Sequence, residues 1–385
     1  MSRPAFRSAD VVAAIVLAAG RSSRMGDFKP LMPFGGATLI GHVVSGLRDA
    51  GVARIHVVTG FMAEALEPEL DHLGVTVAHN AAFDRGMLSS VQSGVASLTA
   101  ETDAFLLMPV DVPLVRPATV ARLLDAASAD DAVILYPAFF GARGHPPLIG
   151  RALFADILGF VGEGGLMALL ARHERGARDV RVFDAGCLAD MDCPEDFRRL
   201  SEALPRRRFP DAKECDAMLD AAATPEPVRR HCRAAAAVAV DIARRLRAAG
   251  EPIDLDWARA AATLHDIAKG GPRHAEAGAA MVSAFGFPEL ADAIARHADL
   301  GGGARLDEAA VVHLADKLVA GESRVSLEAR FLPALTRFAN DPEAFAAASR
   351  RYAEAKAIEE AVEARIGRVA PRRETAREGA LLGAA

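Results

Sequence analysis

Cysteines are scarce in this chain and follow no metal-binding or disulfide pattern. The 385 residues include four cysteines, at positions 187, 193, 215 and 232, and no two of them form a CxxC pair. Their spacing resembles neither a zinc ribbon nor a disulfide framework. Cysteines used in this way are typical of a reducing compartment, so we expect a cytoplasmic protein.

Long hydrophobic runs and a strong charge of one sign are also missing. The apolar run over residues 11–20 follows Arg3 and Arg7 in a way that imitates a signal peptide. It is shorter than the roughly 20 apolar residues that span a bilayer, and it continues directly into Arg21 and Arg24. The formal net charge of −6 supplies no general attraction to nucleic acid or to an anionic membrane. We therefore expect neither as a partner, and we interpret the run as a buried strand that leads into a loop.

Alternating strand and helix patterns fill the first half of the chain. Short β-rich runs begin at residues 11, 54, 75, 104, 132 and 180, and segments with helical spacing lie between them. This alternation predicts an α/β fold with a doubly wound, mostly parallel, Rossmann-like sheet covered by helices on both faces. In such sheets ligands bind beyond the carboxyl ends of the strands, so residues that directly follow a strand are candidates for function.

The composition changes after residue 200, which together with the length predicts two domains. Two proline-bearing stretches, LPRRRFP and AAATPEP, precede a region rich in alanine, arginine, leucine and glutamate with helical periodicity. We expect an α/β domain over residues 1–203, a linker over 204–227, an all-α domain over 228–369 and a disordered tail over 370–385.

One loop combines glycines, hydroxyls and cations directly after the first predicted strand. Glycines let the backbone turn its N–H groups towards an anion, hydroxyls add donors, and cations add charge. The residues concerned are Gly20, Gly26, Ser22, Ser23, Arg24 and Lys29. Their spacing fits neither a Walker A loop nor a GxGxxG dinucleotide fingerprint. The loop therefore predicts a phosphate site of another kind, with a triphosphate as its natural ligand.

A single carboxylate stands at the end of another predicted strand. Asp111 directly follows the apolar run AFLLMPV and precedes Pro113. A carboxylate in this position can hold Mg²⁺ against phosphate oxygens, because this cation favours one or two carboxylates together with phosphates and water. An aspartate that only forms a turn before proline is the competing interpretation.

The loop sequence LAAGRSSRMGDFKPL resembles the signature of nucleotidyltransferases that act on the molybdenum cofactor and, more widely, on sugar phosphates. The resemblance covers roughly the first 200 residues. It implies that Gly20, Arg24 and Lys29 hold a triphosphate and that Arg24, Lys29 and Asp111 carry catalysis with Mg²⁺. It also implies nucleotide contacts from this loop and from the segment NAAFDRGMLSSVQSG, by Leu17, Ala18, Ala19, Gly20, Ser22, Ser23, Asn80, Gly86, Ser89 and Ser90.

Two later segments resemble the acceptor side of the same family. GARGHPPLI contains His145, and DMDCPEDF contains Asp190 and Asp192, which implies contacts with the acceptor or with a second metal. A helix start is the competing interpretation for the latter. Ala19 stands where guanylyl-transferring relatives usually show glycine, and this favours CTP. The resemblance thus implies transfer of CMP to the terminal phosphate of molybdopterin, with a molybdoenzyme or its maturation chaperone as a protein partner.

The second half contains an ordered set of histidines and aspartates, residue types that bind divalent metals. Their order resembles the HD superfamily of metal-dependent phosphohydrolases over about residues 228–330. The resemblance implies one or two ions of Mn, Fe, Zn or Mg, and a phosphate contact by Lys269. The implied metal ligands are His231, His265, Asp266, His274, His297 and Asp316. We interpret His313 as an ordinary core or surface histidine.

Three functions are compatible with these patterns. We expect a bifunctional enzyme that transfers a nucleotidyl group from an NTP to a small phosphorylated acceptor, releases pyrophosphate, and hydrolyses a phosphoester at its second site. A transferase that acts on a sugar or polyol phosphate is one alternative. A nucleotide-sensing regulator with an inactive HD domain is the other.

Overall fold

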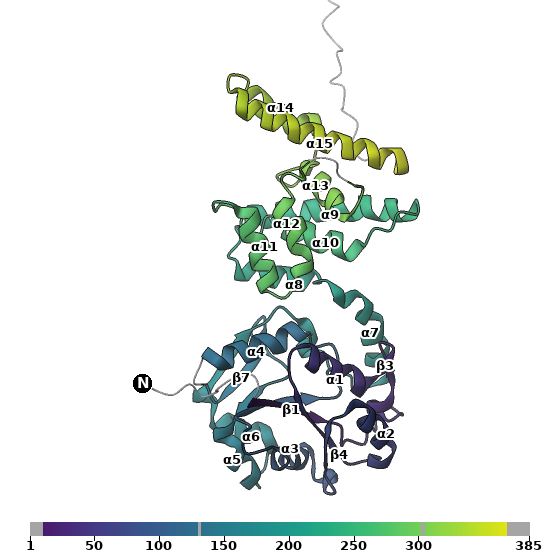
Figure 1. Ribbon diagram of the computed structural model, residues 1–385, viewed down its shortest axis with the longest axis vertical. Helices are drawn as coiled ribbons and strands as arrows, with labels where there is room; N and C mark the ends of the chain where they lie inside the picture. Colours follow the sequence, from purple (N-terminus) through teal and green to yellow (C-terminus); the bar gives the residue numbers. More distant parts are fainter. Residues whose placement is uncertain (1–10, 130–131, 302–304, 368–385) are drawn as a thin grey trace, which may run out of the picture. The chain divides into compact units, whose positions relative to one another are not determined.

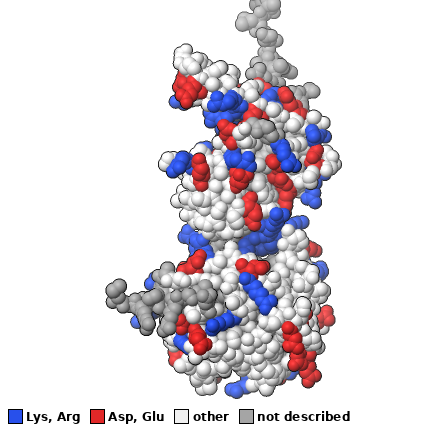
Figure 2. Space-filling model, in the orientation of Figure 1, with Lys and Arg blue, Asp and Glu red and all other residues white. Residues whose placement is uncertain are grey.

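The computed structural model describes residues 11–129, 132–301 and 305–367. The chain divides into two compact units, and the boundary lies between Arg208 and Phe209. Within the described ranges, no helix joins the length and the apolar character that crossing a bilayer requires. On the face shown in Figure 2, acidic and basic side chains are interspersed over each unit. The tail expected over residues 370–385 lies outside the described residues.

The first unit is built on a mostly parallel sheet with helices on both faces (Figure 1). In the described residues this sheet has eight strands in the order β10-β7-β9-β6-β1-β4-β5, with β8 beside β7, and β2 (Pro33–Phe34) and β3 (Ala37–Thr38) form a separate antiparallel pair. Within the eight-stranded sheet, only the pairs that involve β8 and β9 are antiparallel. Its strands are β1 (Val12–Leu17), β4 (Arg54–Thr59), β5 (Thr76–His79), β6 (Ala104–Pro109), β7 (Ile134–Phe139), β8 (Ala142–Arg143), β9 (Leu148–Gly150) and β10 (Ala177–Arg181).

Seven helices of the described residues cover this sheet or follow it. Ala14 and Val16 of β1 join the core on one face, while Ile15 joins the core on the other. Both faces are therefore buried, which explains why the strand reads as a continuous apolar run. The helices are α1 (Leu39–Asp49), α2 (Ala63–Leu73), α3 (Met87–Ala96), α4 (Pro117–Ala129), α5 (Phe154–Gly159), α6 (Gly165–Arg172) and α7 (Pro194–Ala203).

Helix α3 lies unusually close to the sheet, and a glycine makes this possible. A Cβ atom added to Gly94 would lie 2.5 Å from Cγ2 of Ile15 and 3.1 Å from Cγ2 of Val58. Only a residue without a side chain fits between α3 and strands β1 and β4. This contact fixes α3 against β1, which leads into the phosphate loop, and against its neighbour β4.

Several strands differ from the sequence expectation, and two of them belong to the continuous order of paired strands in the main sheet. β10 begins three residues earlier than the predicted run at residue 180, because its pairing with β7 runs from Ala177 opposite Ile134 to Arg181 opposite Ala138. β9 was not expected, since three residues are too few to show an alternating pattern. The carboxyl-end geometry of the other predicted strands is unaffected.

The second unit is helical, as expected, apart from a two-stranded hairpin (Figure 1). Its core helices approach closely because their buried faces are rich in alanine, including Ala235 and Ala239 of α9 and Ala261 of α10. The elements are α8 (Ala212–Ala221), α9 (Glu226–Ala248), α10 (Leu255–Leu264), α11 (His274–Ala284), α12 (Ala291–Arg296), α13 (Glu308–Lys317), β11 (Val319–Ala320), β12 (Ser323–Arg324), α14 (Leu327–Arg337) and α15 (Pro342–Ile366).

The segment expected to be a linker, residues 204–227, is largely helical. Asp211 caps α8 in a capping box, because its side chain accepts from the Glu214 backbone N–H while the Glu214 carboxylate accepts from that of Asp211. Cys215 and Met218 of α8 are fully buried against the rest of the second unit. The prolines on either side of this segment therefore mark helix ends rather than an extended connection.

Candidate functional site

The predicted phosphate loop leaves β1 at the carboxyl edge of the sheet and is held there by backbone bonds. The N–H of Ala18 donates to the carbonyl of Val58 at 3.0 Å, and the N–H of Phe61 donates to the carbonyl of Ala19 at 3.1 Å. A Cβ atom at Gly60 would lie 2.9 Å from Cβ of Ala19, so the segment after β4 can pack against the loop only because residue 60 is a glycine. The start of the loop is thus anchored to β4.

The end of the loop is closed by Ser22. Its hydroxyl accepts from the backbone N–H of Lys29 at 3.2 Å, and its carbonyl accepts from the N–H of Met25 at 2.9 Å. Gly26 has a φ of +86°, a conformation that favours glycine. These contacts curl the loop back so that Lys29 faces the end of β1.

A cavity of about 290 Å³ lies between this loop, the end of β6 and the start of α3. Of the predicted nucleotide and catalytic residues, nine line it: Leu17, Ala18, Ala19, Gly20, Ser22, Lys29, Gly86, Ser90 and Asp111. The remaining lining residues are Pro30, Phe83, Met87, Pro109 and Val110. The cavity therefore combines a polar loop with an apolar wall.

Charged side chains from three distant segments meet beside this cavity. The ammonium of Lys29 lies 3.4 Å from Oδ2 of Asp111 and 3.5 Å from Oδ1 of Asp192. Arg24 reaches the other oxygen of Asp192 at 3.0 Å. Asp192 is placed by the start of α7, where the Asp196 carboxylate accepts from its backbone N–H at 3.1 Å. The Lys29 side chain is only 10% exposed, so this cluster is partly shielded from solvent.

The two aspartates suit a hard divalent cation. Oxygens of Asp111 and Asp192 converge on a single ammonium group, which shows that this position is favourable for positive charge. Carboxylate oxygens are the ligands that Mg²⁺ takes together with phosphate and water. The residues present therefore fit the magnesium ion that the sequence implies, with Asp111 and Asp192 as its protein ligands.

Asn80 and Ser89 do not line the cavity but stabilise the segments that do, through hydrogen bonds. The buried amide of Asn80 donates to the hydroxyls of Ser89 at 2.9 Å and Ser90 at 3.0 Å, and its oxygen accepts from the N–H of Ala82. This network joins the end of β5 to the first turn of α3. Of the three, only Ser90 lines the cavity. Ser23, also predicted, is exposed on the loop.

His145 lies near the aspartates but outside the cavity lining. Its Nδ1 is buried and has no hydrogen-bond partner within the described residues. Burial lowers the pKa of His145 below its ordinary value, although the charges of Asp111 and Asp190 oppose this shift. Burial therefore favours the neutral form of the ring, which has one nitrogen without a hydrogen-bond partner. Asp190 itself is exposed, and the structure does not bring it to Lys29 as it brings Asp192.

The predicted metal ligands of the second unit come together from the ends and faces of several helices. His231 lies on α9, Asp316 on α13 and His274 at the start of α11. His265 and Asp266 directly follow α10 and lie in a turn. His297 directly follows α12. Three overlapping groups have donor atoms within 4.8 Å of one another: His231 with His265 and Asp266, His265 with His297 and Asp316, and Asp266 with His274 and His297.

The histidines are oriented by backbone carbonyls behind them. The Nδ1 atoms of His231, His265 and His297 lie 3.0, 2.7 and 2.8 Å from the carbonyls of Gly321, Ala262 and Ile294. A carbonyl only accepts, so each Nδ1 carries the proton and each Nε2 presents a lone pair in the neutral ring. The rings therefore point their metal-binding nitrogens at the same place.

The atoms that face one another in this cluster are mostly acceptors, which is what a metal site requires. Nε2 of His265 and of His274 are buried and form no hydrogen bond within the described residues. Carboxylate oxygens of Asp266 nevertheless lie 3.5 and 3.3 Å from them. Lone pairs held this close are stabilised by a cation between them. The six side chains thus fit one or two divalent ions.

Charge around the cluster keeps its carboxylates ionised. Burial alone would raise the pKa of Asp316, but the charge of Lys317 opposes this, and the pKa lies well below its ordinary value. Lys269 reaches Asp266 at 2.9 Å, and Lys317 reaches Asp316 at 2.6 Å. Lys269 lines the same pocket as five of the six predicted metal ligands, and its contact with a phosphate stays a prediction.

Two family models match the two units. Residues 14–177 match the MobA-like NTP transferase domain, and residues 228–321 match the HD domain. A phosphoenolpyruvate guanylyltransferase of Rubrobacter xylanophilus is 35% identical over 194 residues, which are 47% of this chain and 87% of that protein. The chain belongs to the MobA-like NTP transferases and carries an HD domain.

Two further relatives also match less than half of this chain. The molybdenum cofactor cytidylyltransferase of Escherichia coli is 26% identical over 184 residues, 48% of this chain and 92% of that protein. The bifunctional protein GlmU of Rhizorhabdus wittichii is 37% identical over 124 residues, 32% of this chain. This chain spans only 27% of the length of that GlmU.

Sequence reasoning missed one polar feature of the transferase site. Arg21 lies between two predicted nucleotide contacts and forms a two-pronged pair with Asp84, with Nε and Nη2 both 2.8 Å from its oxygens. Its guanidinium also lies 5.3 Å from the ring centroids of Phe61 and Phe83. The pair links the phosphate loop to the segment before α3. Its signal in the sequence was only that both residues lie in predicted nucleotide-binding segments.

The HD match ends before the last two helices of the described chain. α14 and α15 follow residue 321, yet Arg330, Phe331, Ala348 and Arg351 from them line the metal-site pocket. His313, by contrast, is fully buried, and its Nδ1 lies 2.9 Å from the His297 carbonyl.

Proposed function

We propose that the first unit transfers a nucleotidyl group from CTP to the terminal phosphate of a small phosphorylated acceptor, with molybdopterin as the favoured acceptor. One observation carries this proposal: Lys29, Asp111 and Asp192 meet at the mouth of a cavity formed by the glycine-bearing loop. Such a site gathers cations and a metal-binding carboxylate pair where a triphosphate would lie.

The proposed catalysis depends on position and charge. Backbone N–H groups of the loop with Lys29 and Arg24 would hold the triphosphate and offset the charge that develops on the α-phosphoryl group. A magnesium ion held by Asp111 and Asp192 would supply Lewis acidity at the same group. The acceptor phosphate would then attack in line, and pyrophosphate would leave. His145, neutral and with a free nitrogen, would contact the acceptor, and no residue needs to act as a covalent nucleophile.

Support for cytidine and molybdopterin comes from Ala19 and from similarity to the Escherichia coli molybdenum cofactor cytidylyltransferase over 92% of its length. A second candidate rests on a specific comparison. The phosphoenolpyruvate guanylyltransferase is the more similar of the two in sequence, at 35% against 26% identity. Both candidates join a nucleotidyl group to an acceptor phosphate, so the same site geometry serves either.

The decisive experiment is a matrix of pyrophosphate-release assays. CTP and GTP are each tested with molybdopterin, phosphoenolpyruvate and sugar or polyol phosphates, and Asp111→Asn is assayed beside the parent. We expect turnover with CTP and molybdopterin and its loss in the variant. Turnover with GTP and phosphoenolpyruvate alone would replace the favoured candidate by the second. Retention of full cellular function by a folded Asp111→Asn variant would favour the nucleotide-sensing regulator instead.

For the HD domain we propose metal-dependent hydrolysis of a phosphoester. The supporting observation is that buried Nε2 atoms without a hydrogen-bond partner face the Asp266 carboxylate beside Lys269. Purified protein should contain Mn, Fe, Zn or Mg in stoichiometric amount, and His265→Ala should reduce that content. Metal content that is absent in the parent, or unchanged in His265→Ala, would remove this proposal. A cytoplasmic location and a molybdoenzyme or chaperone partner stay predictions of the sequence.

A further inference from the structure

The pocket of the HD domain has two walls of different chemistry. Its volume is about 510 Å³, within the range of pockets that hold small organic ligands. Five of the six metal ligands, all except the fully buried His265, form one wall with Lys269 and Lys317. Helices α14 and α15 form another, with Arg330, Phe331, Ala334, Ala348 and Arg351. The second wall lies outside the part of the chain that matches the HD family.

Helix geometry explains why two arginines share this wall. Arg330 and Ala334 are four residues apart on α14, and Ala348 and Arg351 are three apart on α15, so each pair lies on one helix face. The ring centroids of Phe331 and Tyr352 are 5.4 Å apart, and this contact joins the two helices directly beside the arginines. The alanines leave the space between the arginines and the metal ligands open.

The two arginines differ in charge pairing from the lysines of the opposite wall. Lys269 and Lys317 are paired with the metal ligands Asp266 and Asp316. Arg330 and Arg351, by contrast, form no ion pair within the described part of the chain. The side chain of Arg351 donates from Nε to the Ala347 carbonyl of its own helix, at 3.2 Å.

Two unpaired guanidiniums in one pocket are suited to an anion. Arginine presents a planar fork of donors that matches phosphate oxygens, and proteins use it for that purpose. The phosphoryl group to be cleaved would lie at the metal ligands and Lys269. The arginines would therefore meet a different anionic group of the same molecule, while Pro227, Val228 and Phe331 offer apolar surface to its organic part.

We propose that Arg330 and Arg351 bind a second phosphoryl group, and that the HD substrate is an organic diphosphate of the nucleoside diphosphate type. The identity of the first group rests on the proposed hydrolase function. In the reaction, water adds to the terminal phosphorus and the bridging P–O bond breaks. The bridging oxygen keeps the electron pair, and the proton from water passes to solvent. The products are inorganic phosphate and a nucleoside monophosphate.

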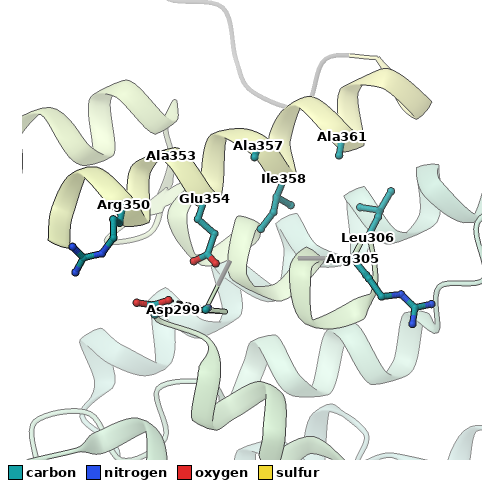
Figure 3. Close-up of a pocket in the computed structure, with 10 residues that line it drawn as sticks. Asp299, Arg305, Leu306, Arg350, Ala353, Glu354, Ala357, Ile358 and Ala361 are labelled. Atoms are coloured by element: carbon teal, nitrogen blue, oxygen red, sulfur yellow. Dashed lines mark hydrogen bonds between the residues drawn. The ribbon is translucent and has the colours of Figure 1, made fainter. Parts of the chain in front are cut away.

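The neighbouring face of α15 offers a matched control. A separate cavity of about 620 Å³ lies against it, lined by Arg350, Glu354 and Ile358 (Figure 3). Arg350 is exposed and precedes Arg351 directly, yet it does not line the metal pocket. Arg350→Ala removes the same charge from the same helix without touching the proposed anion site.

The test measures binding to the full chain by calorimetry in the presence of Mn²⁺. All variants carry Lys29→Met, which weakens nucleotide binding by the transferase domain and keeps any remainder constant. The probes are the α,β-methylene analogue of ADP, which resists hydrolysis, and AMP, which lacks the second phosphoryl group. We expect the diphosphate to bind at least about tenfold more tightly than AMP, as one charge-assisted contact allows. That advantage should disappear in Arg330→Ala and in Arg351→Ala, return in part in Arg351→Lys, and persist in Arg350→Ala.

Metal content and ADP hydrolysis are measured on the same variants. Equal affinity for the two probes, or an advantage that survives in the Arg330→Ala/Arg351→Ala double variant, would overturn the anion-site proposal. An equal loss in Arg350→Ala would do the same. If the arginine-dependent advantage is present but ADP yields no phosphate, the hydrolase function fails and the anion site stands. If ADP is hydrolysed but the arginine-dependent advantage is absent, the anion site fails and the hydrolase function stands.

Discussion

Replacing Lys29 by methionine separates the catalytic and the structural contribution of the charge cluster in the transferase domain. The ammonium lies 3.4 Å from Asp111 and 3.5 Å from Asp192, whose side chains are 31% and 36% exposed. Water therefore screens both pairs, and such pairs contribute about 0–1 kcal/mol each to stability. Methionine retains the apolar stem that is buried here. We expect the free energy of unfolding to fall by no more than about 2 kcal/mol, the sum of two such pairs.

The expected effect on transfer is much larger. Lys29 would oppose charge that develops on the phosphoryl groups, and loss of one preorganised donor of this kind costs about 10²–10³ in kcat, or ~3–4 kcal/mol. Steady-state pyrophosphate release and urea unfolding are measured on the same preparation. Lys213→Met, at an exposed position of α8, is the control for the substitution itself. A kcat within about threefold of the parent, less than 1 kcal/mol of effect on the barrier, would refute the role given to Lys29.

Three other outcomes follow from individual contacts. Ala19→Gly removes a methyl group from the cavity and should shift kcat/KM by about tenfold towards GTP relative to CTP, measured by competing the two nucleotides; an unchanged ratio would remove Ala19 as a determinant. Gly94→Ala should destabilise the protein by about 1–3 kcal/mol in urea unfolding because its Cβ meets Ile15, whereas Gly46→Ala, with no heavy atom within 4 Å of its Cβ, should not. Burial lowers the pKa of His56, so its contribution to stability is full above the unfolded pKa of about 6.5 and is lost as pH falls towards the folded value. His56→Gln should therefore lose less stability than the parent between pH 7.5 and pH 5, and an equal loss would contradict this.

Much of the fold could be read from the sequence because its signals are local. A strand buried on both faces leaves a continuous apolar run, as β1, β4, β6 and β7 do, and shorter β-rich runs led to the edge strands β5 and β10. β9 was missed because its three residues form a strand only through partners on both sides. α8 was missed for a related reason: its flanking prolines suggested a linker, while its buried face is defined by the helices that it packs against.

The sequence could identify candidate metal ligands in the HD domain, because histidine and aspartate are typical metal ligands and their order along the chain is characteristic. Their use as ligands depends on geometry that no spacing shows. The carbonyls of Gly321, Ala262 and Ile294 orient the rings, and they belong to three separate segments. Arg330 and Arg351 carried no signal at all, since unpaired arginines on helices are common on protein surfaces.

By itself, the sequence determined the parts of this protein that depend on neighbours along the chain: the glycine-bearing loop after β1, the aspartate after β6, and the ordered histidines. Tertiary structure alone decided which of them meet. It brought Asp192 rather than Asp190 to Lys29, and it placed two arginines opposite the HD metal ligands. The physical reason is that a side chain's direction is set by strand register and helix packing, and these depend on contacts between residues far apart in sequence.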